Sequence, residues 1–239
     1  MLDISTIHQY NIYSEHGEDG ILAYILDYIE TYTDLAERTP RTYVYITDTH
    51  KPTTPLRNLS KAYAYSTNVP MSYNNGLIPC TMDGVSDWLS NPKKHAVHAH
   101  VRVLLVDVCG VDFWLVKTYL THCDESQKPI VIIVRINYIV DPHKSISVPY
   151  APPKRRLNIF NNHYYGASLA AYINMLTPHN YTFVGTTEYG IVGFFIQNMT
   201  GVDVVPIDPT TYLDAFSNIE YARMIRWPQV ENKFWITVT

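Results

Sequence analysis

Residues 101–120 of the chain read VRVLLVDVCGVDFWLVKTYL and decide the fold. The stretch opens with an apolar run typical of a buried strand, and this run ends at Asp107. A short turn then passes Gly110 and reaches Asp112, after which apolar residues return at helical spacing. A strand that enters a helix through an acidic turn places two carboxylates at the carboxyl end of a sheet. Because open α/β sheets bind their ligands at that edge, we expect the functional site there.

The segments on either side extend the same pattern of strands and helices. Strands are predicted at residues 42–47, 62–67, 77–81, 129–137, 181–185 and 191–197, with a final short strand at 234–238. Helices are predicted at residues 21–29, 56–61, 166–176 and 211–226. Asp83 or Ser86 is expected to cap another helix that runs through Leu89. The last two long strands are separated by only a few residues, which predicts an antiparallel hairpin.

This order of elements predicts an α/β protein with a mostly parallel central sheet and helices on both faces. One strand near the C-terminus is expected to run antiparallel to the others. With no internal repeat and no low-complexity linker, a single domain is expected. Within it we expect an N-terminal helical cap at residues 1–41, the core at 42–199 and a C-terminal extension at 200–239.

Composition limits the classes of protein to consider. Of the 239 residues, 46% are hydrophobic and 17% charged, which is typical of a globular domain, and the net charge of -4 disfavours a nucleic-acid partner. The three cysteines, Cys80, Cys109 and Cys123, suit neither a disulfide framework nor a zinc site. The N-terminus is polar, and no apolar run is long enough to cross a bilayer. These features predict a cytoplasmic protein without a membrane span.

Six motifs spread along the chain carry a family resemblance. They are SEHGEDGI at 14–21, TMD at 81–83, LVDVCGVDFW at 105–114, KPIVIIV at 128–134, SVPY at 147–150 and YYGASL at 164–169. In this order and spacing, they resemble the FkbM-like methyltransferases, especially a branch that begins with Ser-x-x-Gly-Glu-Asp-Gly-Ile. The resemblance reaches to about residue 199. It implies a Rossmann-like class I methyltransferase fold, S-adenosylmethionine as methyl donor, and an oxygen acceptor, with a sugar hydroxyl of a glycan as the leading candidate.

An aliphatic hydroxyl must lose a proton during methyl transfer, so a carboxylate or a histidine beside it helps. The residues expected to activate or orient the acceptor are Asp107, Asp112 and His163. Those expected to bind the acceptor are Asn137, Tyr164 and Tyr165, and those expected to contact the donor are Glu18, Asp19, Asp48, Ser66 and Asp83. A divalent cation such as Mg or Mn held by Asp107 and Asp112 is a further candidate, because hard cations prefer oxygen ligands.

Several of these residues also suit structural roles. Asp112 equally suits a helix cap, and acids at the start of a helix are favourable there without any ligand. A packed tyrosine pair is the alternative for Tyr164 and Tyr165. The histidines at 95, 98 and 100 have no carboxylate or cysteine beside them, so we expect them to be solvated rather than to bind metal.

The chain departs from the family pattern mainly on the donor side. Residues 48–52, which follow the first predicted strand, contain no glycine, although a glycine turn normally lets the backbone approach the donor. The predicted second strand ends without an acid for the ribose, Cys109 replaces the second aspartate of the fourth-strand motif, and Arg135 stands where a glutamate is usual. These departures favour a rival interpretation, a catalytically inactive methyltransferase-fold module that binds a glycan or a partner protein. A metal-dependent glycosyltransferase is a weaker third hypothesis, since its Asp-x-Asp motif would lack the second acid.

Overall fold

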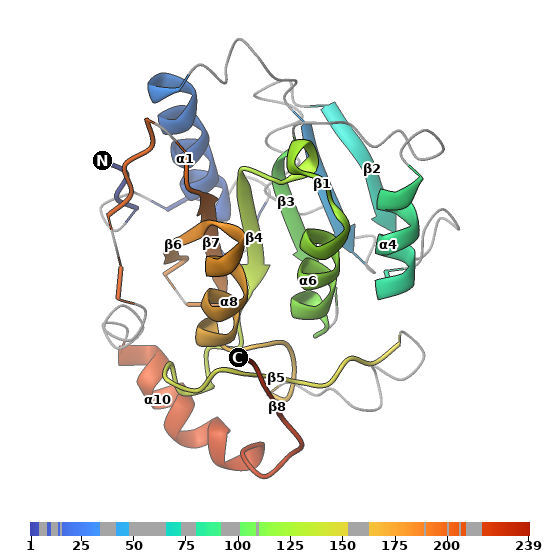
Figure 1. Cartoon of the computed structure of the whole chain (residues 1–239). Helices are drawn as coiled ribbons and strands as arrows, with labels where there is room; N and C mark the ends of the chain where they lie inside the picture. The colour runs from blue at the N-terminus through green and yellow to red at the C-terminus, as the bar shows by residue number, and fades with distance from the viewer. Residues whose placement is uncertain are drawn as a thin grey trace.

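The computed structural model describes residues 1–4, 9–10, 14, 16–33, 42–47, 66–72, 80–91, 101–108, 110–152, 163–188, 190–199, 201–205, 207–208 and 217–239. Its main feature is a six-stranded sheet with the order β2-β1-β3-β4-β7-β6 (Figure 1). The strands are β1 (Thr42–Thr47), β2 (Ser66–Ser72), β3 (Val101–Asp107), β4 (Val131–Arg135), β6 (Tyr181–Thr186) and β7 (Val192–Gln197). Residues 101–107 thus form a central strand, β3.

The strand directions confirm the prediction of a mostly parallel sheet. β2, β1, β3 and β4 pair in parallel, whereas β7 pairs antiparallel with both β4 and β6. β7 is therefore the one strand in this sheet that runs against the others, and the predicted hairpin of β6 and β7 is confirmed. Because the four parallel strands point the same way, their carboxyl ends meet at one edge.

Helices cover both faces of the sheet, as predicted. α1 (Glu18–Tyr32) packs on the face that carries Val103 and Leu105 of β3. The opposite face carries Leu104 and Val106, and it is covered by α4 (Met82–Ser90), α6 (Asp112–His122) and α8 (Leu169–Leu176) (Figure 1). Leu104 and Val106 of β3 thus enter one core and Val103 and Leu105 the other, which explains why this part of the strand is apolar rather than alternating.

The C-terminal part of the chain packs beyond the carboxyl edge of the sheet. It contains α10 (Ser217–Arg226), the 3-10 helix η4 (Trp227–Gln229) and β8 (Ile236–Thr237), and β8 pairs antiparallel with β5 (Ile146–Ser147). A small apolar cluster joins this segment to the turn after β4 through Ile139, Val148, Tyr164 and Val230. The resemblance ends near residue 199 and does not cover α10, η4 and β8, yet these elements lie at the same edge (Figure 1).

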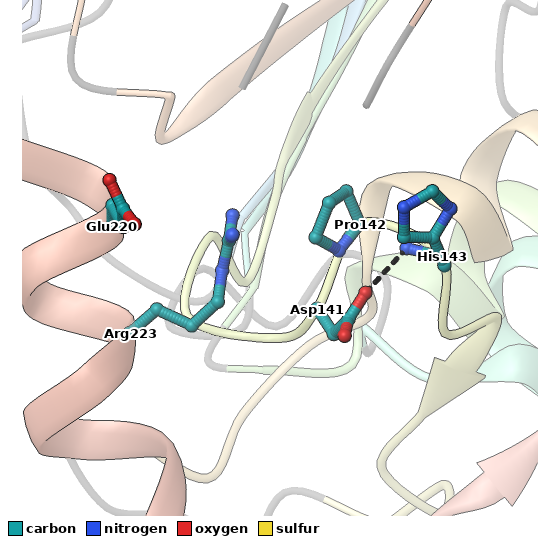
Figure 2. A pocket seen from close by; sticks show the side chains of 5 residues that line it. All are labelled: Asp141, Pro142, His143, Glu220 and Arg223. Atoms are coloured by element: carbon teal, nitrogen blue, oxygen red, sulfur yellow. Dashed lines mark hydrogen bonds between the residues drawn. The ribbon is translucent and has the colours of Figure 1, made fainter. Parts of the chain in front are cut away.

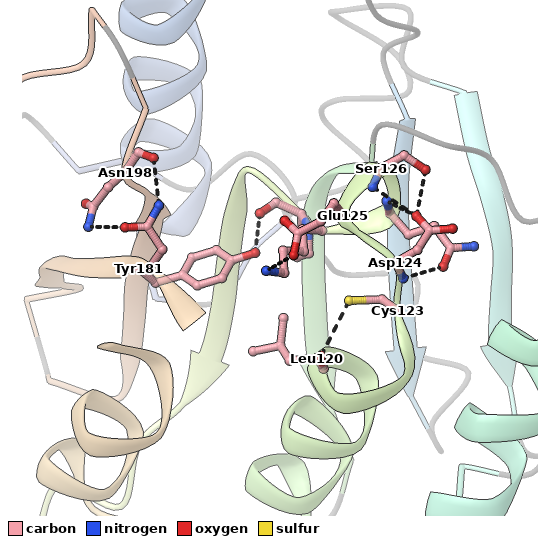
Figure 3. Close-up of polar contacts among 11 residues, drawn as sticks. Leu120, Cys123, Asp124, Glu125, Ser126, Tyr181 and Asn198 are labelled. Atoms are coloured by element: carbon pink, nitrogen blue, oxygen red, sulfur yellow. Dashed lines mark hydrogen bonds and ion pairs between the residues drawn. The ribbon is translucent and has the colours of Figure 1, made fainter. Parts of the chain in front are cut away.

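Polar contacts close the opposite edge, where β4 begins. Asp124 caps the 3-10 helix η2 (Glu125–Gln127) in a reciprocal capping box, and the hydroxyl of Tyr181 donates to the Pro129 carbonyl at 2.6 Å (Figure 3). Burial raises the pKa of the Cys123 thiol to about 11, so this thiol is protonated at neutral pH. Cys123 therefore acts as a packed side chain rather than as a nucleophile. A third 3-10 helix, η3 (Thr177–His179), precedes β6.

Some predicted boundaries differ from the structure. The helix α4 is capped by Thr81, whose side chain accepts from the Gly84 amide at 3.0 Å, and not by Asp83 or Ser86. β2 continues beyond the predicted end at residue 67 to Ser72. It passes through Pro70, a residue that sequence patterns exclude from central strands but that an edge strand tolerates. Residues 56–61, 62–65, 77–79 and 211–216 lie outside the described residues. Among the described residues, every helix is too short or too polar to cross a lipid bilayer.

Candidate functional site

Asp107 and Arg135 form an ion pair at the carboxyl ends of two neighbouring strands, β3 and β4. The Arg135 Nε lies 2.8 Å from Asp107 Oδ1, and the Arg135 Nη2 lies 3.4 Å from Asp107 Oδ2. This two-point geometry fixes the plane of the guanidinium as well as its position. The side chains are 27% and 35% exposed, so both groups remain within reach of a ligand. The sequence prediction placed Asp107 at this edge but did not identify Arg135 as its partner.

Asp112 begins α6 directly behind this pair and is buried. Its Oδ1 accepts a hydrogen bond from the Val108 backbone amide at 2.9 Å, so its carboxyl bridges the turn between β3 and α6. Burial, reinforced by the negative charge of Asp107, raises the pKa of Asp112 to about 8. At neutral pH the group is therefore largely a neutral carboxylic acid. The alternative role considered for this residue, a cap at the start of the helix, is not the one observed, because Val111 is the N-cap of α6, no side chain caps the helix, and Val108 lies before it.

The raised pKa of Asp112 makes stability depend on pH. The folded chain holds a proton on Asp112 that the unfolded chain releases above its ordinary value of 3.8, so the free energy of unfolding should fall as pH rises from about 4 to about 8. Asp112→Asn keeps an oxygen acceptor for Val108 and cannot ionise. We expect its melting temperature to exceed that of the unmodified chain at about pH 8.5, by about 2–4 °C for each 1 kcal/mol relieved, and the gain to shrink toward about pH 5.

The control for this experiment is Asp27→Asn, which removes an exposed carboxylate on α1. Its melting temperature should follow the unmodified chain at every pH. Thermal unfolding followed by circular dichroism between about pH 5 and 9 gives the comparison. A constant difference between Asp112→Asn and the unmodified chain across this range would contradict the protonated state assigned to Asp112.

Asn137 holds the loop that precedes α8 against the end of β4. Its Nδ2 donates to the carbonyl oxygens of His163 at 3.0 Å and Tyr165 at 2.8 Å, and its Oδ1 accepts from the Ile139 amide at 3.3 Å. Both amide hydrogens are used and the side chain is 1% exposed. The contacts therefore give Asn137 a positioning role rather than the direct acceptor contact expected from sequence. One more bond, from the Gly166 amide to the Gly110 carbonyl at 2.9 Å, ties this loop to the turn after β3.

The neighbouring tyrosines Tyr164 and Tyr165 point into different surroundings. Tyr164 is buried against Trp235, with ring centroids 4.9 Å apart, and its hydroxyl donates to the Phe234 carbonyl. The expected acceptor contact by Tyr164 would require the C-terminal segment to move, and its ring packs on Trp235 rather than in the tyrosine pair considered as the alternative. Tyr165 is partly exposed. It stays among the ligand-facing candidates, as does the partly exposed His163 at the start of the loop.

Tyr165 lies close to the charged groups of this edge. Burial raises the pKa of its hydroxyl to about 12, and the neighbouring Tyr138 and Asp112 raise it further while Arg135 and Arg226 oppose the shift. The hydroxyl is therefore neutral and able to donate a hydrogen bond at physiological pH. Asp112 and Arg135, from two other elements, thus both act electrostatically on Tyr165 at this edge.

The acidic start of α1 forms a local cap. The Asp19 Oδ2 accepts from the Ser14 amide at 2.9 Å, while the Ser14 hydroxyl accepts from the Asp19 amide at 3.3 Å, and Glu18 accepts from the His16 amide at 2.8 Å. Gly17 has a φ of 91°, and a Cβ there would lie 2.8 Å from Gln9 Oε1. The Ser-x-x-Gly-Glu-Asp motif thus has a structural role at the start of α1. Donor contact by Glu18 and Asp19 stays a prediction.

The other predicted donor contacts lie around β1, β2 and α4. Asp83 is exposed in the first turn of α4. Ser66 is the first residue of β2, but its side chain lies outside the described part of the structure, as do Asp48 and the whole 48–65 segment. Cys80 donates its thiol hydrogen to the Thr47 carbonyl at 2.7 Å, which ties the start of α4 to the end of β1. The donor-side prediction is therefore neither supported nor opposed by contacts.

The C-terminal extension adds residues that the sequence prediction missed. Arg226 of α10 donates from its Nη1 to the hydroxyl of Tyr138, in the turn after β4. Beside this contact, a pocket of about 370 Å³ separates that turn from α10, and Figure 2 shows Glu220 and Arg223 of α10 facing it from one side. Asp141 and His143 line the other side (Figure 2). No signal in the sequence pointed to this contact, because the resemblance ends near residue 199.

The divalent cation expected at Asp107 and Asp112 stays a prediction. Asp107 is engaged by Arg135, and burial raises the pKa of Asp112, so a cation bound there would take the place of both Arg135 and the Asp112 proton, because hard cations need ionised oxygen ligands. Elsewhere in the described part of the chain, no group of three or more His, Cys, Asp or Glu side chains has the arrangement of a metal site. The histidines at 95, 98 and 100 lie outside that part.

The structure thus defines an α/β protein whose polar and charged side chains gather at the carboxyl ends of β3 and β4. A scan against protein-family models found no match to this chain, and a search of the curated proteins found none either. Assignment of a function therefore depends on the chemistry of this edge and on the motifs in the sequence.

Proposed function

We propose that the chain is an S-adenosylmethionine-dependent O-methyltransferase that methylates a sugar hydroxyl of a glycan. The observation that carries the proposal is the Asp107–Arg135 pair at the carboxyl edge, with Asp112 behind it. Polar groups at this edge of an open α/β sheet are where such folds bind and transform ligands. The finer assignment to a Rossmann-like class I methyltransferase fold is part of the proposal, supported by the single antiparallel strand near the C-terminal end of the sheet.

Methyl transfer requires the protein mainly to align the acceptor hydroxyl with the donor and to remove the proton of that hydroxyl. The donor supplies an activated methyl group on a sulfonium, so the chain has to orient the acceptor oxygen and accept its proton. Asp107, held by Arg135, is positioned to accept a hydrogen bond from the acceptor hydroxyl. Tyr165 is able to donate one to a neighbouring oxygen, and His163 begins the same loop.

On the donor side the proposal rests on the family resemblance. Glu18, Asp19, Asp48, Ser66 and Asp83 are the proposed contacts. In the structure, Thr47 at the end of β1 and Cys80 before α4 are joined by a hydrogen bond. This bond brings the end of β1 and the residue before α4 together.

Incubation of the chain with S-adenosylmethionine and a panel of oligosaccharides, followed by mass spectrometry, tests the proposal. The expected result is a mass gain of one methylene unit per modified acceptor, together with formation of the demethylated donor. Donor consumption without a modified sugar would direct the search to another acceptor class. Absence of both across the panel would contradict the enzyme assignment.

The rival function is a catalytically inactive methyltransferase-fold module that binds a glycan or a partner protein. The observation that favours it is the ion pair itself, because both carboxylate oxygens of Asp107 already contact Arg135. The glycine-free segment at residues 48–52 agrees with it. Under this rival, Asp107→Asn would leave the biological role of the chain intact.

A further inference from the structure

Arg226 is a cation without a carboxylate partner among the described residues. Its guanidinium donates a hydrogen bond to the hydroxyl of Tyr138. Arg102 and Arg135, by contrast, each form an ion pair, with Glu30 and Asp107 respectively. Arg226 is only partly buried, so its guanidinium keeps donors and a full positive charge at the carboxyl edge of the sheet.

The hydroxyl of Tyr165 adds an uncommitted donor near Arg226. No described residue forms a hydrogen bond with this hydroxyl, and the loop that carries it is fixed by Asn137. Both Arg226 and Arg135 act electrostatically on Tyr165, one from α10 and one from the end of β4. The Tyr165 carbonyl accepts from Asn137, and Arg226 donates to the adjacent Tyr138. With Arg135 at the end of β4, two cations and a hydroxyl donor from three elements therefore gather at the turn after β4.

The acids nearby do not cancel this positive charge. Asp107 is already paired with Arg135, and Asp112 is buried and largely neutral, since burial raises its pKa to about 8. Asp141 faces Arg223 across the adjacent pocket, and Glu220 lines that pocket from α10, on the same side as Arg223 (Figure 2). The charge of Arg226 is thus the excess at this edge.

We propose that Arg226, Tyr165 and Arg135 bind a negatively charged group of the acceptor, so that the acceptor is an acidic sugar. A carboxylate and a phosphate share the required chemistry, because each presents two or more oxygens to the planar fork of a guanidinium. The identification of the bound sugar as the methyl acceptor rests on the proposed function. The anion site itself depends only on the described contacts. Through Arg226, the C-terminal extension therefore determines which acceptor is bound, in addition to packing at the carboxyl edge of the sheet.

Direct binding to three simple probes tests the proposal without any methyl transfer. The probes are a methyl glucuronoside, a glucose phosphate and the neutral methyl glucoside, titrated into the full chain by isothermal calorimetry or by ligand-observed NMR. We expect at least one acidic probe to bind about tenfold or more tighter than the neutral sugar. The tighter of the two acidic probes tells whether a carboxylate or a phosphate is the natural group.

Two variants and a control tie the preference to this site. Arg226→Gln and Tyr165→Phe should each reduce the preference for the acidic probe, and Arg226→Gln should reduce it to less than about threefold. Tyr165→Phe leaves α10 untouched, so it keeps the test valid if Arg226→Gln lowers stability. Lys233→Gln removes an exposed cation of the same extension, located 5.2 Å from the Tyr164 ring, and should leave the preference unchanged.

Equal binding of acidic and neutral probes would overturn the inference, and so would a preference that survives both variants. The outcome is separable from the proposed function. Acidic sugars that bind through Arg226 without any methyl transfer would sustain the anion site and reject the enzyme. Methyl transfer to a neutral sugar, unaffected by Arg226→Gln, would sustain the enzyme and reject the anion site.

Discussion

Replacing Asp107 with asparagine should lower kcat/KM for methyl transfer by at least about 100-fold, because general-base and orienting contacts contribute on the order of 100-fold or more. The substitution keeps the shape of the side chain but removes the charge that accepts the acceptor proton. It also removes the partner that fixes the guanidinium of Arg135, whose Nε lies 2.8 Å from Asp107. Initial rates over a range of acceptor concentrations measure the effect, with circular dichroism to show that the fold is retained.

Arg135→Gln, alone and combined with Asp107→Asn, tests whether the two side chains act together. If Asp107 and Arg135 act as a unit, the loss in the double variant should be close to that of the larger single loss rather than the product of both. Asp27→Asn, an exposed carboxylate change on α1, is the matched control and should stay within about twofold of the unmodified chain. An Asp107→Asn variant with rates near those of the unmodified chain would remove Asp107 from the mechanism and favour the binding-module rival.

Asn137→Ala should cause the largest loss of stability among the site residues, about 3 kcal/mol in the free energy of unfolding. The change leaves the carbonyl oxygens of His163 and Tyr165, and the Ile139 amide, without their side-chain partner at a position that is 1% exposed. A destabilisation of this size corresponds to a fall of about 6–12 °C in melting temperature for a chain of this length. Urea unfolding followed by fluorescence gives the free energy directly.

The control for Asn137→Ala is Asn174→Ala. Asn174 is exposed on α8 and donates a hydrogen bond to the Ser145 hydroxyl at 2.9 Å. Because water replaces that bond, the loss should be below about 1 kcal/mol. Similar losses for the two variants would contradict the role of Asn137 in fixing the loop. A stable Asn137→Ala variant with unchanged activity would show that the loop geometry does not matter for function.

The sheet was predictable because its signals are local and strong. β3, β4, β6 and β7 are rich in apolar residues, and the acidic turn after β3 placed Asp107 and Asp112 at the correct edge. β2 was harder, since Pro70 stands inside it and only its place at the edge of the described sheet makes that possible. The cap of α4 was misassigned to Asp83 or Ser86 because several residues that favour capping stand near its start, and only coordinates show that Thr81 bonds to Gly84.

The site was only partly predictable, because its contacts join residues far apart in the chain. Asp107 and Arg135 are adjacent only because β3 and β4 pair, and Arg226 reaches Tyr138 across 88 positions. Arg135 did carry a signal, since it replaced the glutamate of the resembled family. The roles of Asn137 and Tyr164 could not be read from residue type, because an asparagine that fixes a loop and one that binds a sugar look alike in sequence. The same holds for the donor contacts at Glu18 and Asp19, whose caps have a structural explanation.

The most direct test of the central claim is isothermal calorimetry of the full chain with S-adenosylmethionine and, separately, with its demethylated product. An O-methyltransferase with the proposed donor site should bind both, with saturable heats and a dissociation constant in the micromolar range typical of working enzymes. Absence of heat for both at millimolar concentration, repeated in the presence of acidic and neutral sugars, would contradict the proposed enzyme and leave the binding module as the function of this edge.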